Sequence, residues 1–443
     1  MGGVIWNAQA ETLPRDRLEE LQLERLRTAL QRQLRSVPPQ RERLQAAGLG
    51  SAEGLRGLHQ LRDLPFTTKA DLREAYPFGL FAVPRQEVVR IHASSGTRGK
   101  PTVVGYTRND LDVWSEVMAR TLALCGVEPG MVVHNAYGYG LFTGGLGFHQ
   151  GAERMGCTVI PMSGGFTQRQ VLMLEDLGGQ VLCATPSYAL SIAQTMRELG
   201  VDPARLQLRI GCFGAEPWTE QMRDEIERQL SLIAINVYGL SEIVGPGVSA
   251  ECIEGRNGAH VQEDHFLLEV VEPRTGEPLP PGEEGELVFT TLTKEALPMV
   301  RYRTGDISAV DLEPCRCGRT TARMARVRGR YDDMLIIRGV NLYPSEVERV
   351  LLGLGDIGPH YQLVVERPGH LDELSVLCEP VTAEMTELES LRERAARALR
   401  EATGLSIRVE VLAPGSVPRS EGKAVRVIDH RTSLPAGILR SND

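Results

Sequence analysis

The sequence of 443 residues lacks the segments that would place a protein in or beyond a membrane. No apolar run approaches the roughly 18 residues that a membrane-spanning helix needs, and the first residues have neither the basic nor the apolar region of a signal peptide. Position 6 is Trp6, whereas an N-myristoylation motif needs Ser or Thr there. We therefore expect a cytoplasmic protein without a membrane partner.

An excess of basic residues, a disulfide framework and internal repeats are also missing. The chain carries 49 Lys and Arg against 58 Asp and Glu, and a net charge of -9 argues against a general nucleic-acid binder. Its eight cysteines do not form the pattern of a secreted disulfide scaffold. Five of them lie singly among apolar or small residues, as buried thiols do: Cys125, Cys157, Cys183, Cys212 and Cys378. The length suggests two to three domains, each with its own core.

A Walker phosphate loop is absent, yet residues 93–102 (ASSGTRGKPT) have the composition of an anion-binding loop. Glycines let successive N–H groups point into one concavity, and hydroxyls with a lysine complete it. Only Thr97 and Arg98 separate Gly96 from Gly99, and Pro101 replaces the Walker hydroxyl, so a strand-to-helix phosphate loop is excluded. Apolar runs on both sides predict a loop between two strands. A solvated turn remains the alternative at this point.

The apolar periodicity predicts an α/β fold. Leucines at helical spacing indicate helices at about 13–37 and 39–48, another helix opens near Phe66, and residues 109–125 are also helical. Four short apolar strands then alternate with helices, which is typical of parallel α/β layers, at 132–134, 158–160, 181–183 and 209–213. Ligands gather at the carboxyl ends of such strands, where the loops at 135–145, 214–218 and 237–242 lie.

The loop at 135–145 combines glycines with aromatic residues. Its spacing, Gly-x-Gly followed by three residues and a third glycine, is not a dinucleotide fingerprint. Glycines beside Tyr137, Tyr139 and Phe142 would leave room for a flat ligand between ring faces. An aromatic core loop is the alternative.

The C-terminal third changes character twice. Beyond Glu251 the strands and Pro/Gly turns predict an antiparallel β-rich part. From Asp332 a βαββαβ order predicts a separate α+β domain of about 110 residues. We therefore divide the chain into a large N-terminal domain, 1–331, and a small mobile C-terminal domain, 332–443.

Five motifs occur in an order that resembles the adenylate-forming superfamily of acyl-CoA synthetases, adenylation domains and luciferases. They are the loop at 94–102, Tyr-Gly-Leu-Ser-Glu at 238–242, Tyr-Arg-Thr-Gly-Asp at 302–306, Gly-Arg-Tyr-Asp-Asp at 329–333 and Gly-Lys at 422–423. Within that superfamily the chain is similar to the phenylacetate–coenzyme A ligases over essentially its whole length, including residues 137–142, 213–218 and 332–341.

This resemblance implies a two-step reaction. A carboxylate attacks the α-phosphate of ATP to give an acyl-adenylate and pyrophosphate, and the thiol of coenzyme A then displaces AMP. It implies an aryl acid, ATP and coenzyme A as small-molecule partners, Mg²⁺ as cofactor, and leaves the oligomeric state open, with a homodimer among the alternatives.

The resemblance also implies roles for individual residues. Lys423 would be catalytic in adenylation, Glu242 would hold Mg²⁺, Asp306 would accept the ribose hydroxyls with the help of Arg330, and Asp332 occupies the hinge position. The triphosphate would lie on Ser94, Ser95, Gly96, Thr97, Gly99 and Lys100. Adenine would be flanked by Gly214, Ala215 and Glu216 on one side and by Asn236, Val237, Tyr238 and Gly239 on the other. The aryl pocket would include Tyr137, Phe142, Gly144 and Gly214.

Three remaining cysteines suggest a metal. Cys315 and Cys317 lie one residue apart, and with Cys252 and His260 they offer three thiolates and one imidazole, a common closed zinc set. Cys-x-Cys is looser than paired Cys-x-x-Cys, and His265 competes as the nitrogen ligand; cysteines at these places in the relatives favour the site. Four protein ligands would make the Zn²⁺ structural.

Two other functions are the alternatives. An adenylating enzyme that uses a hydroxy- or amino-benzoate and delivers it to a carrier protein or an amine would have every motif above. A non-catalytic nucleotide-binding or zinc-organised interaction protein would not need Lys423, Glu242 and Asp306 together.

Overall fold

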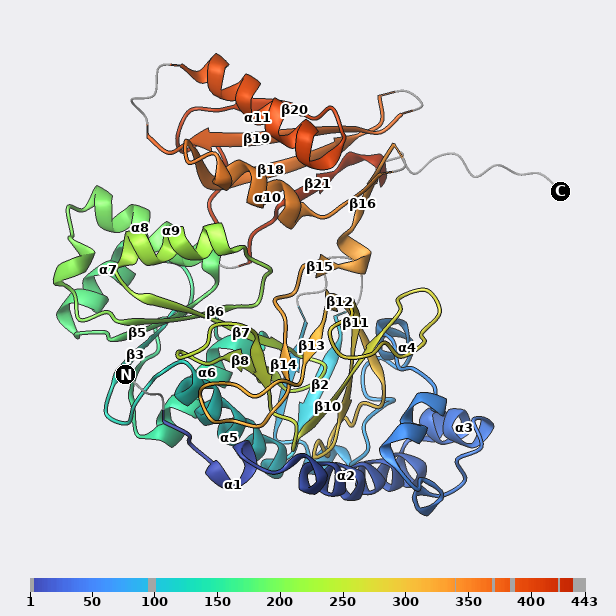
Figure 1. Cartoon of the computed structure of the whole chain (residues 1–443). Helices are drawn as coiled ribbons and strands as arrows, with labels where there is room; N and C mark the ends of the chain where they lie inside the picture. The colour runs from blue at the N-terminus through green and yellow to red at the C-terminus, as the bar shows by residue number, and fades with distance from the viewer. Residues whose placement is uncertain are drawn as a thin grey trace.

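The computed structural model describes residues 4–94, 101–338, 340–368, 371–382, 387–420 and 423–432. Two units are visible in Figure 1: an N-terminal unit (residues 4–330) and a C-terminal unit (residues 335–432) that lies on top of it, next to α8 (Pro186–Glu198) and α9 (Glu220–Leu230). The fold is the expected mixed α/β fold. In the described part of the chain, no helix has both the length and the apolarity to cross a membrane.

A sheet of nine strands forms the centre of the N-terminal unit, in the order β13-β14-β9-β8-β7-β6-β5-β3-β4. Its strands β3 to β7 are parallel, which confirms the prediction for this region. The other four extend it in antiparallel fashion. The bounds are β3 Val132–Asn135, β4 Thr158–Ile160, β5 Val181–Ala184, β6 Ile210–Gly214, β7 Ile233–Leu240, β8 Gly245–Glu251, β9 Ala259–Val261, β13 Val310–Asp311 and β14 Arg323–Met324.

Helices cover both faces of this sheet because its parallel strands are apolar on both sides. In β5, Val181 and Cys183 join the core beneath α5 (Arg108–Leu124) and α6 (Thr143–Met155), whereas Leu182 and Ala184 face the core beneath α7 (Thr167–Asp176), α8 and α9. A threonine N-cap opens α5, α8 and α9, with side-chain acceptors for the orphan N–H groups.

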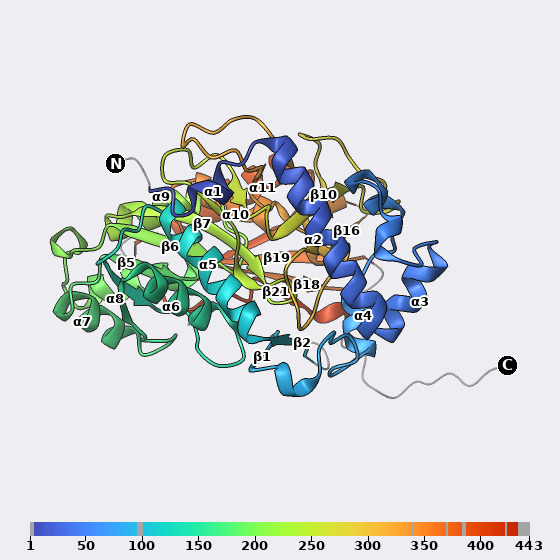
Figure 2. The same cartoon turned by 90° about the horizontal axis from the view of Figure 1, so that it is seen from below.

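The N-terminal helices are where the leucine pattern predicts them: α2 Arg15–Ser36, α3 Pro38–Ala46 and α4 Lys69–Glu74, after a short α1 (Ala8–Glu11). Figure 2 shows α2 lying along the underside of the N-terminal unit. Leu26 and Leu30 of α2 pack with Leu267 and Leu292, so this helix closes the β-rich part from below.

That β-rich part is antiparallel, as predicted. Its sheet has the order β10-β11-β12-β15, and a separate hairpin joins β1 to β2. The bounds are β1 Arg90–Ala93, β2 Val103–Tyr106, β10 Phe266–Val271, β11 Gly285–Thr291, β12 Tyr302–Ser308 and β15 Gly329–Arg330. Short 3-10 turns lie at η1 Ala52–Gly54, η2 Leu58–Asp63, η3 Arg85–Glu87 and η4 Pro203–Arg205.

The C-terminal unit has its own core, but its strand order differs from the predicted βαββαβ. The first strand, β16, pairs only with β17 in a small hairpin, and the four-stranded sheet has the order β20-β19-β18-β21. The edge strand β21 was not predicted. It lies four residues after Lys423 and pairs with β18. The sheet therefore anchors the end of the segment around Lys423, which we call the lysine segment. The bounds are β16 Leu335–Ile337, β17 Val340–Leu342, α10 Pro344–Gly353, β18 Ile357–Glu366, β19 Glu373–Pro380, α11 Leu388–Thr403, β20 Arg408–Val411, β21 Val427–Asp429 and η6 His430–Thr432.

A short 3-10 turn, η5 (Tyr331–Asp333), links the two units between β15 and β16. The domain division at residues 331 and 332 remains our proposal, and it falls inside this turn. Asp332, the expected hinge residue, lies here, and its side chain is outside the described part of the structure.

Candidate active site

The loop at 93–102 does join two antiparallel strands. Its base is closed by Ser94, whose N–H donates to the Thr102 carbonyl at 3.0 Å and whose hydroxyl accepts from the Thr102 N–H at 3.2 Å. Ser95, Gly96, Thr97, Arg98, Gly99 and Lys100 lie outside the described residues. The hairpin lies beside the aromatic loop, because the Leu141 carbonyl accepts from the Ala93 N–H at 2.9 Å.

The residues predicted for the aryl pocket lie together. Tyr137 is 3% exposed and stacks on Phe148 with ring centroids 5.0 Å apart. Burial raises the pKa of its hydroxyl well above the usual value, and the nearby Gly214 backbone partly offsets this rise. A Cβ on Gly144 would lie 2.5 Å from the Phe142 ring and 3.2 Å from the Tyr137 ring. Glycine at position 144 therefore preserves a gap between two aromatic side chains.

The two predicted adenine-flanking segments are neighbours through the pairing of β6 with β7. Gly214 pairs with Val237, and a Cβ on Gly214 would lie 2.0 Å from the Val237 carbonyl oxygen, so only glycine fits. Ala215 follows with a φ of +72°. The amide oxygen of Asn236 accepts from the Trp218 indole at 2.8 Å, which fixes the orientation of the Asn236 side chain. Gly239 lies further along β7, where a Cβ would meet the Gly245 carbonyl at 2.1 Å.

Asp306 lies in a cluster with two other predicted residues. The Tyr238 hydroxyl donates to one carboxylate oxygen at 2.6 Å, and Arg330 donates to the other at 3.2 Å. Burial, together with the Asp306 carboxylate, raises the pKa of Tyr238 well above its usual value, so the phenol stays a donor. Both carboxylate oxygens are hydrogen-bond acceptors, the kind of group that binds a ligand hydroxyl.

Glu242 is buried just beyond β7, at 7% exposure. The Tyr302 hydroxyl is its neighbour: burial chiefly, and the Glu242 charge in second place, raise the pKa of Tyr302. A buried carboxylate offers the oxygen ligands that Mg²⁺ prefers.

The loop after β6 also contacts the C-terminal unit. One oxygen of Glu216 accepts from the Ser187 N–H at 2.8 Å, and the other accepts from the Ala424 N–H at 2.8 Å. Lys423, whose side chain is exposed, is the residue before Ala424. The carboxylate of Glu216 therefore ties the lysine segment to the predicted adenine-flanking loop, although the sequence suggested no such contact.

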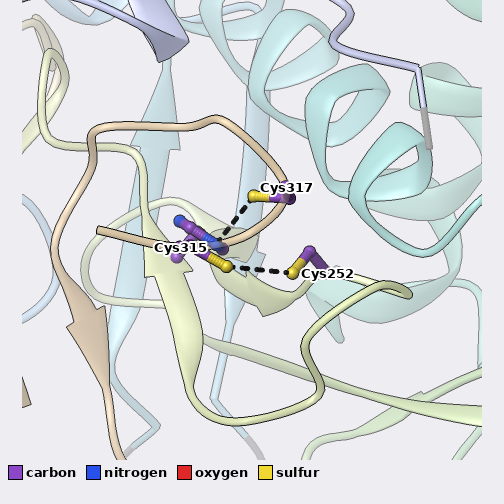
Figure 3. A group of neighbouring side chains, drawn as sticks. Cys252, Cys315 and Cys317 are labelled. Carbon is purple, nitrogen blue, oxygen red and sulfur yellow. Dashed lines mark hydrogen bonds between the residues drawn. The ribbon is translucent and has the colours of Figure 1, made fainter. Parts of the chain in front are cut away.

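The four predicted zinc ligands form one cluster; Figure 3 shows Cys315 and Cys317, on one loop, and Cys252, just after β8, converging. The ligand atoms of Cys252, His260, Cys315 and Cys317 all lie within 4.8 Å of one another. The Cys252 and Cys315 sulfurs are 3.6 Å apart, and the Cys317 sulfur is 3.4 Å from Nε2 of His260. Tetrahedral zinc bonded at about 2.3 Å to sulfur and about 2.0 Å to nitrogen separates its ligands by roughly 3.8 and 3.5 Å, so the cluster has the dimensions of a zinc site.

Neighbouring groups form hydrogen bonds with the predicted ligands and change the pKa of one of them. Nδ1 of His260 lies 2.9 Å from the Thr321 hydroxyl, which directs Nε2 towards the sulfurs. The Gly255 N–H donates to the Cys252 sulfur at 3.3 Å. A hydrogen bond from Cys252, followed by the contact with His260, lowers the pKa of the Cys317 thiol.

His265, the alternative nitrogen ligand, lies outside the cluster. Its Nδ1 is 2.9 Å from the Thr293 hydroxyl and its Nε2 is 3.2 Å from Asp264. Burial lowers the pKa of His265 to about 4. The structure thus favours His260 between the two candidates.

Comparisons with known proteins agree on one family. The model of the AMP-binding enzyme family matches residues 58–292, and that of the AMP-binding enzyme C-terminal domain matches 339–431. The chain is 53% identical to the phenylacetate-coenzyme A ligase of Thermus thermophilus, over 97% of this chain and 100% of the relative. It is 51% identical to the phenylacetate-coenzyme A ligase of Escherichia coli, over 96% of this chain and 98% of the relative.

Solved structures of 2-hydroxyisobutyryl-CoA ligase, 29–30% identical to this chain, distinguish two arrangements. In the postadenylation state with an acyl-AMP, that ligase superposes with a TM-score of 0.90 over 96% of this chain and 92% of its own. In the thioesterification state the TM-score is 0.72 over 97% of each chain.

Proposed function

The chain belongs to the AMP-binding enzyme family and, within it, to the phenylacetate-coenzyme A ligases, and from this membership we propose that it converts phenylacetate, or a closely similar aryl acid, to its coenzyme A thioester. The reaction consumes ATP, proceeds through an acyl-adenylate and releases AMP and pyrophosphate. The identity of 53% over 97% of the chain to a phenylacetate-coenzyme A ligase supports coenzyme A as the acceptor.

The observation that carries the proposal is the convergence of five separate segments on one site. The base of the hairpin at Ser94 lies against the aromatic loop, which reaches Gly214 through Tyr137, and the loop after β6 holds the lysine segment through Glu216. Asp306 is joined to β7 by Tyr238. These contacts bring together the segments to which we assign the phosphate, acid, adenine and ribose sites and the catalytic lysine.

In the first step, the carboxylate of the acid attacks the α-phosphate of ATP. The ammonium of Lys423 would donate to the oxygens of the forming anhydride, and Asp306 with Arg330 would hold the ribose so that the phosphate is presented in line. Glu242 would hold Mg²⁺, which supplies charge neutralisation on the phosphate oxygens when bound.

The arrangement of the two units supports assigning this structure to the adenylation stage of the reaction. Ala424 is hydrogen-bonded to Glu216, and the TM-score with 2-hydroxyisobutyryl-CoA ligase is higher for its postadenylation state than for its thioesterification state. For thiolysis we propose that the C-terminal unit then moves about residue 332, because the thioesterification state of that relative matches the present arrangement less well.

We also propose that Cys252, His260, Cys315 and Cys317 hold a structural Zn²⁺. The donor set, its dimensions and the Thr321 contact support this metal. Four protein ligands leave no open position, so the metal would link β8, β9 and the loop before β14 and take no part in the reaction. The cytoplasmic location and the homodimer remain expectations.

A substrate panel tests the main proposal. Purified protein is incubated with ATP, Mg²⁺, coenzyme A and a series of aryl and aliphatic acids, and AMP and thioester are measured. We expect phenylacetate to give the highest kcat/KM. AMP release with none of the acids would contradict the proposal, and adenylate formation without thioester would redirect it towards a different acceptor.

The Gly144→Ala variant tests the aryl pocket. The added methyl would lie 3.2 Å from the buried Tyr137 ring and 2.5 Å from the Phe142 ring, so the gap between the rings closes. One methyl of misfit in a pocket costs about 1–3 kcal/mol, so we expect the KM for phenylacetate to rise about tenfold or more. Gly138→Ala in the same loop is the matched control, because no atom lies within 4 Å of its added methyl. Equal KM values for the two variants would place the acid elsewhere.

A further inference from the structure

The lysine segment of the C-terminal unit is attached to the N-terminal unit on both sides of Lys423. Among the described residues, four hydrogen bonds before and after the lysine connect the segment to α8 or to the loop after β6. They are Arg419 to Gln194 at 3.0 Å, Ser191 to the Ser420 carbonyl at 3.4 Å, Ala424 to Glu216 at 2.8 Å and Arg426 to Ser187 at 3.3 Å. The position of Lys423 therefore depends on how firmly the C-terminal unit docks.

A second, buried contact holds the same interface. Glu348, on α10 of the C-terminal unit, is 4% exposed. One of its oxygens accepts from both the N–H (3.2 Å) and the hydroxyl (3.0 Å) of Thr219, and the other accepts from the Tyr361 hydroxyl at 3.0 Å. Thr219 is the N-cap of α9, and its hydroxyl also accepts from the Met222 N–H at 3.2 Å. A carboxylate of one unit thus lies at the N-terminus of a helix of the other, where orphan N–H groups and the helix dipole favour negative charge.

The charge of Glu348 is balanced inside its own unit. Arg426 lies 3.8 Å from the carboxylate and stacks over the Tyr361 ring at 4.4 Å. If the C-terminal unit rotates away, Glu348 loses Thr219 but keeps Tyr361 and Arg426, and water can replace it at the helix end. Because Tyr361 and Arg426 move together with Glu348, the carboxylate is never left as an unpaired buried charge, which would be energetically costly. The contact with Thr219 can therefore open and close repeatedly.

We propose that Glu348 is a positioning residue for adenylation: by capping α9 across the interface, it holds the C-terminal unit in the arrangement that brings Lys423 to the nucleotide site. The inference rests on the proposed function, because it assigns the contact to one of two half-reactions. Arg426 connects this contact to the lysine, since it is three residues from Lys423 and donates to Ser187 at the start of α8.

The Glu348→Ala and Glu348→Gln variants test the proposal. Adenylation is measured as phenylacetate-dependent ATP–pyrophosphate exchange, and thiolysis as thioester formation from supplied phenylacetyl-adenylate and coenzyme A. We expect exchange to fall about tenfold or more, because hydrogen bonds to a charged group are lost, while thiolysis is unchanged or faster. Arg349→Gln, an exposed change on the same helix, should leave both rates at the wild-type level.

Changes at Thr219 test the same contact from the other unit. Thr219→Ser keeps the helix cap and both donors, so both half-reactions should remain normal. Thr219→Asp keeps a good N-cap but places a carboxylate against Glu348, so exchange should fall at least as far as in Glu348→Ala. A merely structural role would instead slow both half-reactions equally and lower Tm. That outcome would overturn the proposal, and so would a wild-type rate of ATP–pyrophosphate exchange in Glu348→Ala.

Hydrogen exchange separates this inference from the proposed function. In Glu348→Ala, the amides at the start of α9 and in residues 423–427 should exchange faster than in the wild type, with the core of α10 unchanged. This result would support the contact even if phenylacetate were not the substrate. If hydrogen exchange in Glu348→Ala is unchanged while the wild-type enzyme is active on phenylacetate, the role of the Glu348 contact is refuted and the proposed function stands.

Discussion

Replacing Lys423 by alanine is expected to slow adenylate formation by a hundredfold or more and to leave thiolysis of supplied phenylacetyl-adenylate largely intact. Removing one donor aimed at developing charge commonly costs about 3 kcal/mol, which corresponds to this factor. The side chain of Lys423 is exposed, so its loss should leave Tm unchanged. The backbone anchor at Ala424 does not involve the lysine side chain, so the segment itself should still dock.

Lys423→Gln and Lys423→Arg are the matched variants for this test. Glutamine keeps a donor without charge and should be nearly as slow as alanine, whereas arginine keeps the charge and should recover part of the rate. Pyrophosphate exchange and single-turnover thiolysis are measured for each. Equal loss in both half-reactions would remove the adenylation role, and a rate near wild type for Lys423→Ala would assign the charge stabilisation to another residue.

Local patterns were sufficient for most of the fold. The apolar strand at β5 lies between helical segments, and its side chains alternate between two cores, which is the arrangement that a buried parallel strand requires. The two glycines and Pro101 excluded a Walker loop, and the structure places β1 and β2 on either side of that loop. These features are determined by residues that are close together in the sequence, so they could be predicted from the sequence alone.

The C-terminal unit shows where local patterns fail. β16, β17 and β21 each have only three residues, and the turn between β16 and β17 begins at Arg338 with a φ of +51°. An apolar run as short as Leu335–Ile337 gives no sign of its partner strand. The predicted βαββαβ order therefore lacked both β17, the partner of β16, and β21, the partner of β18.

The contacts between the units were missed for a related reason. Glu348 and Thr219 are 129 residues apart, and neither lies in a motif. The one available signal was Thr219 followed by an amphipathic helix, which predicts an N-cap but not a second acceptor from another unit. The choice between His260 and His265 also needed the structure, because it depends on the register that places His260 beside Arg323 in β14.

Loss of the metal is expected to give the second large effect. Removing Zn²⁺ with a chelator, or replacing Cys317 by serine, should lower Tm by on the order of 10 °C, because structural zinc contributes several kcal/mol or more to folding. Metal analysis should find one zinc per chain in the wild type and much less in the variant. Cys157→Ser, at a half-buried cysteine outside the cluster, should change neither value.

The destabilisation should spread from the cluster to the N-terminus. Arg319, two residues after Cys317, forms a buried ion pair with Glu11, and the Thr320 N–H donates to the Glu11 carbonyl at 3.1 Å. Without the metal, the loop that carries Arg319 is no longer fixed by Cys315 and Cys317, so α1 should exchange its amides faster while the C-terminal unit is unaffected. A zinc-free protein with wild-type Tm and unchanged exchange in α1 would contradict the structural metal. Loss of adenylation before any loss of Tm would contradict its separation from the active site.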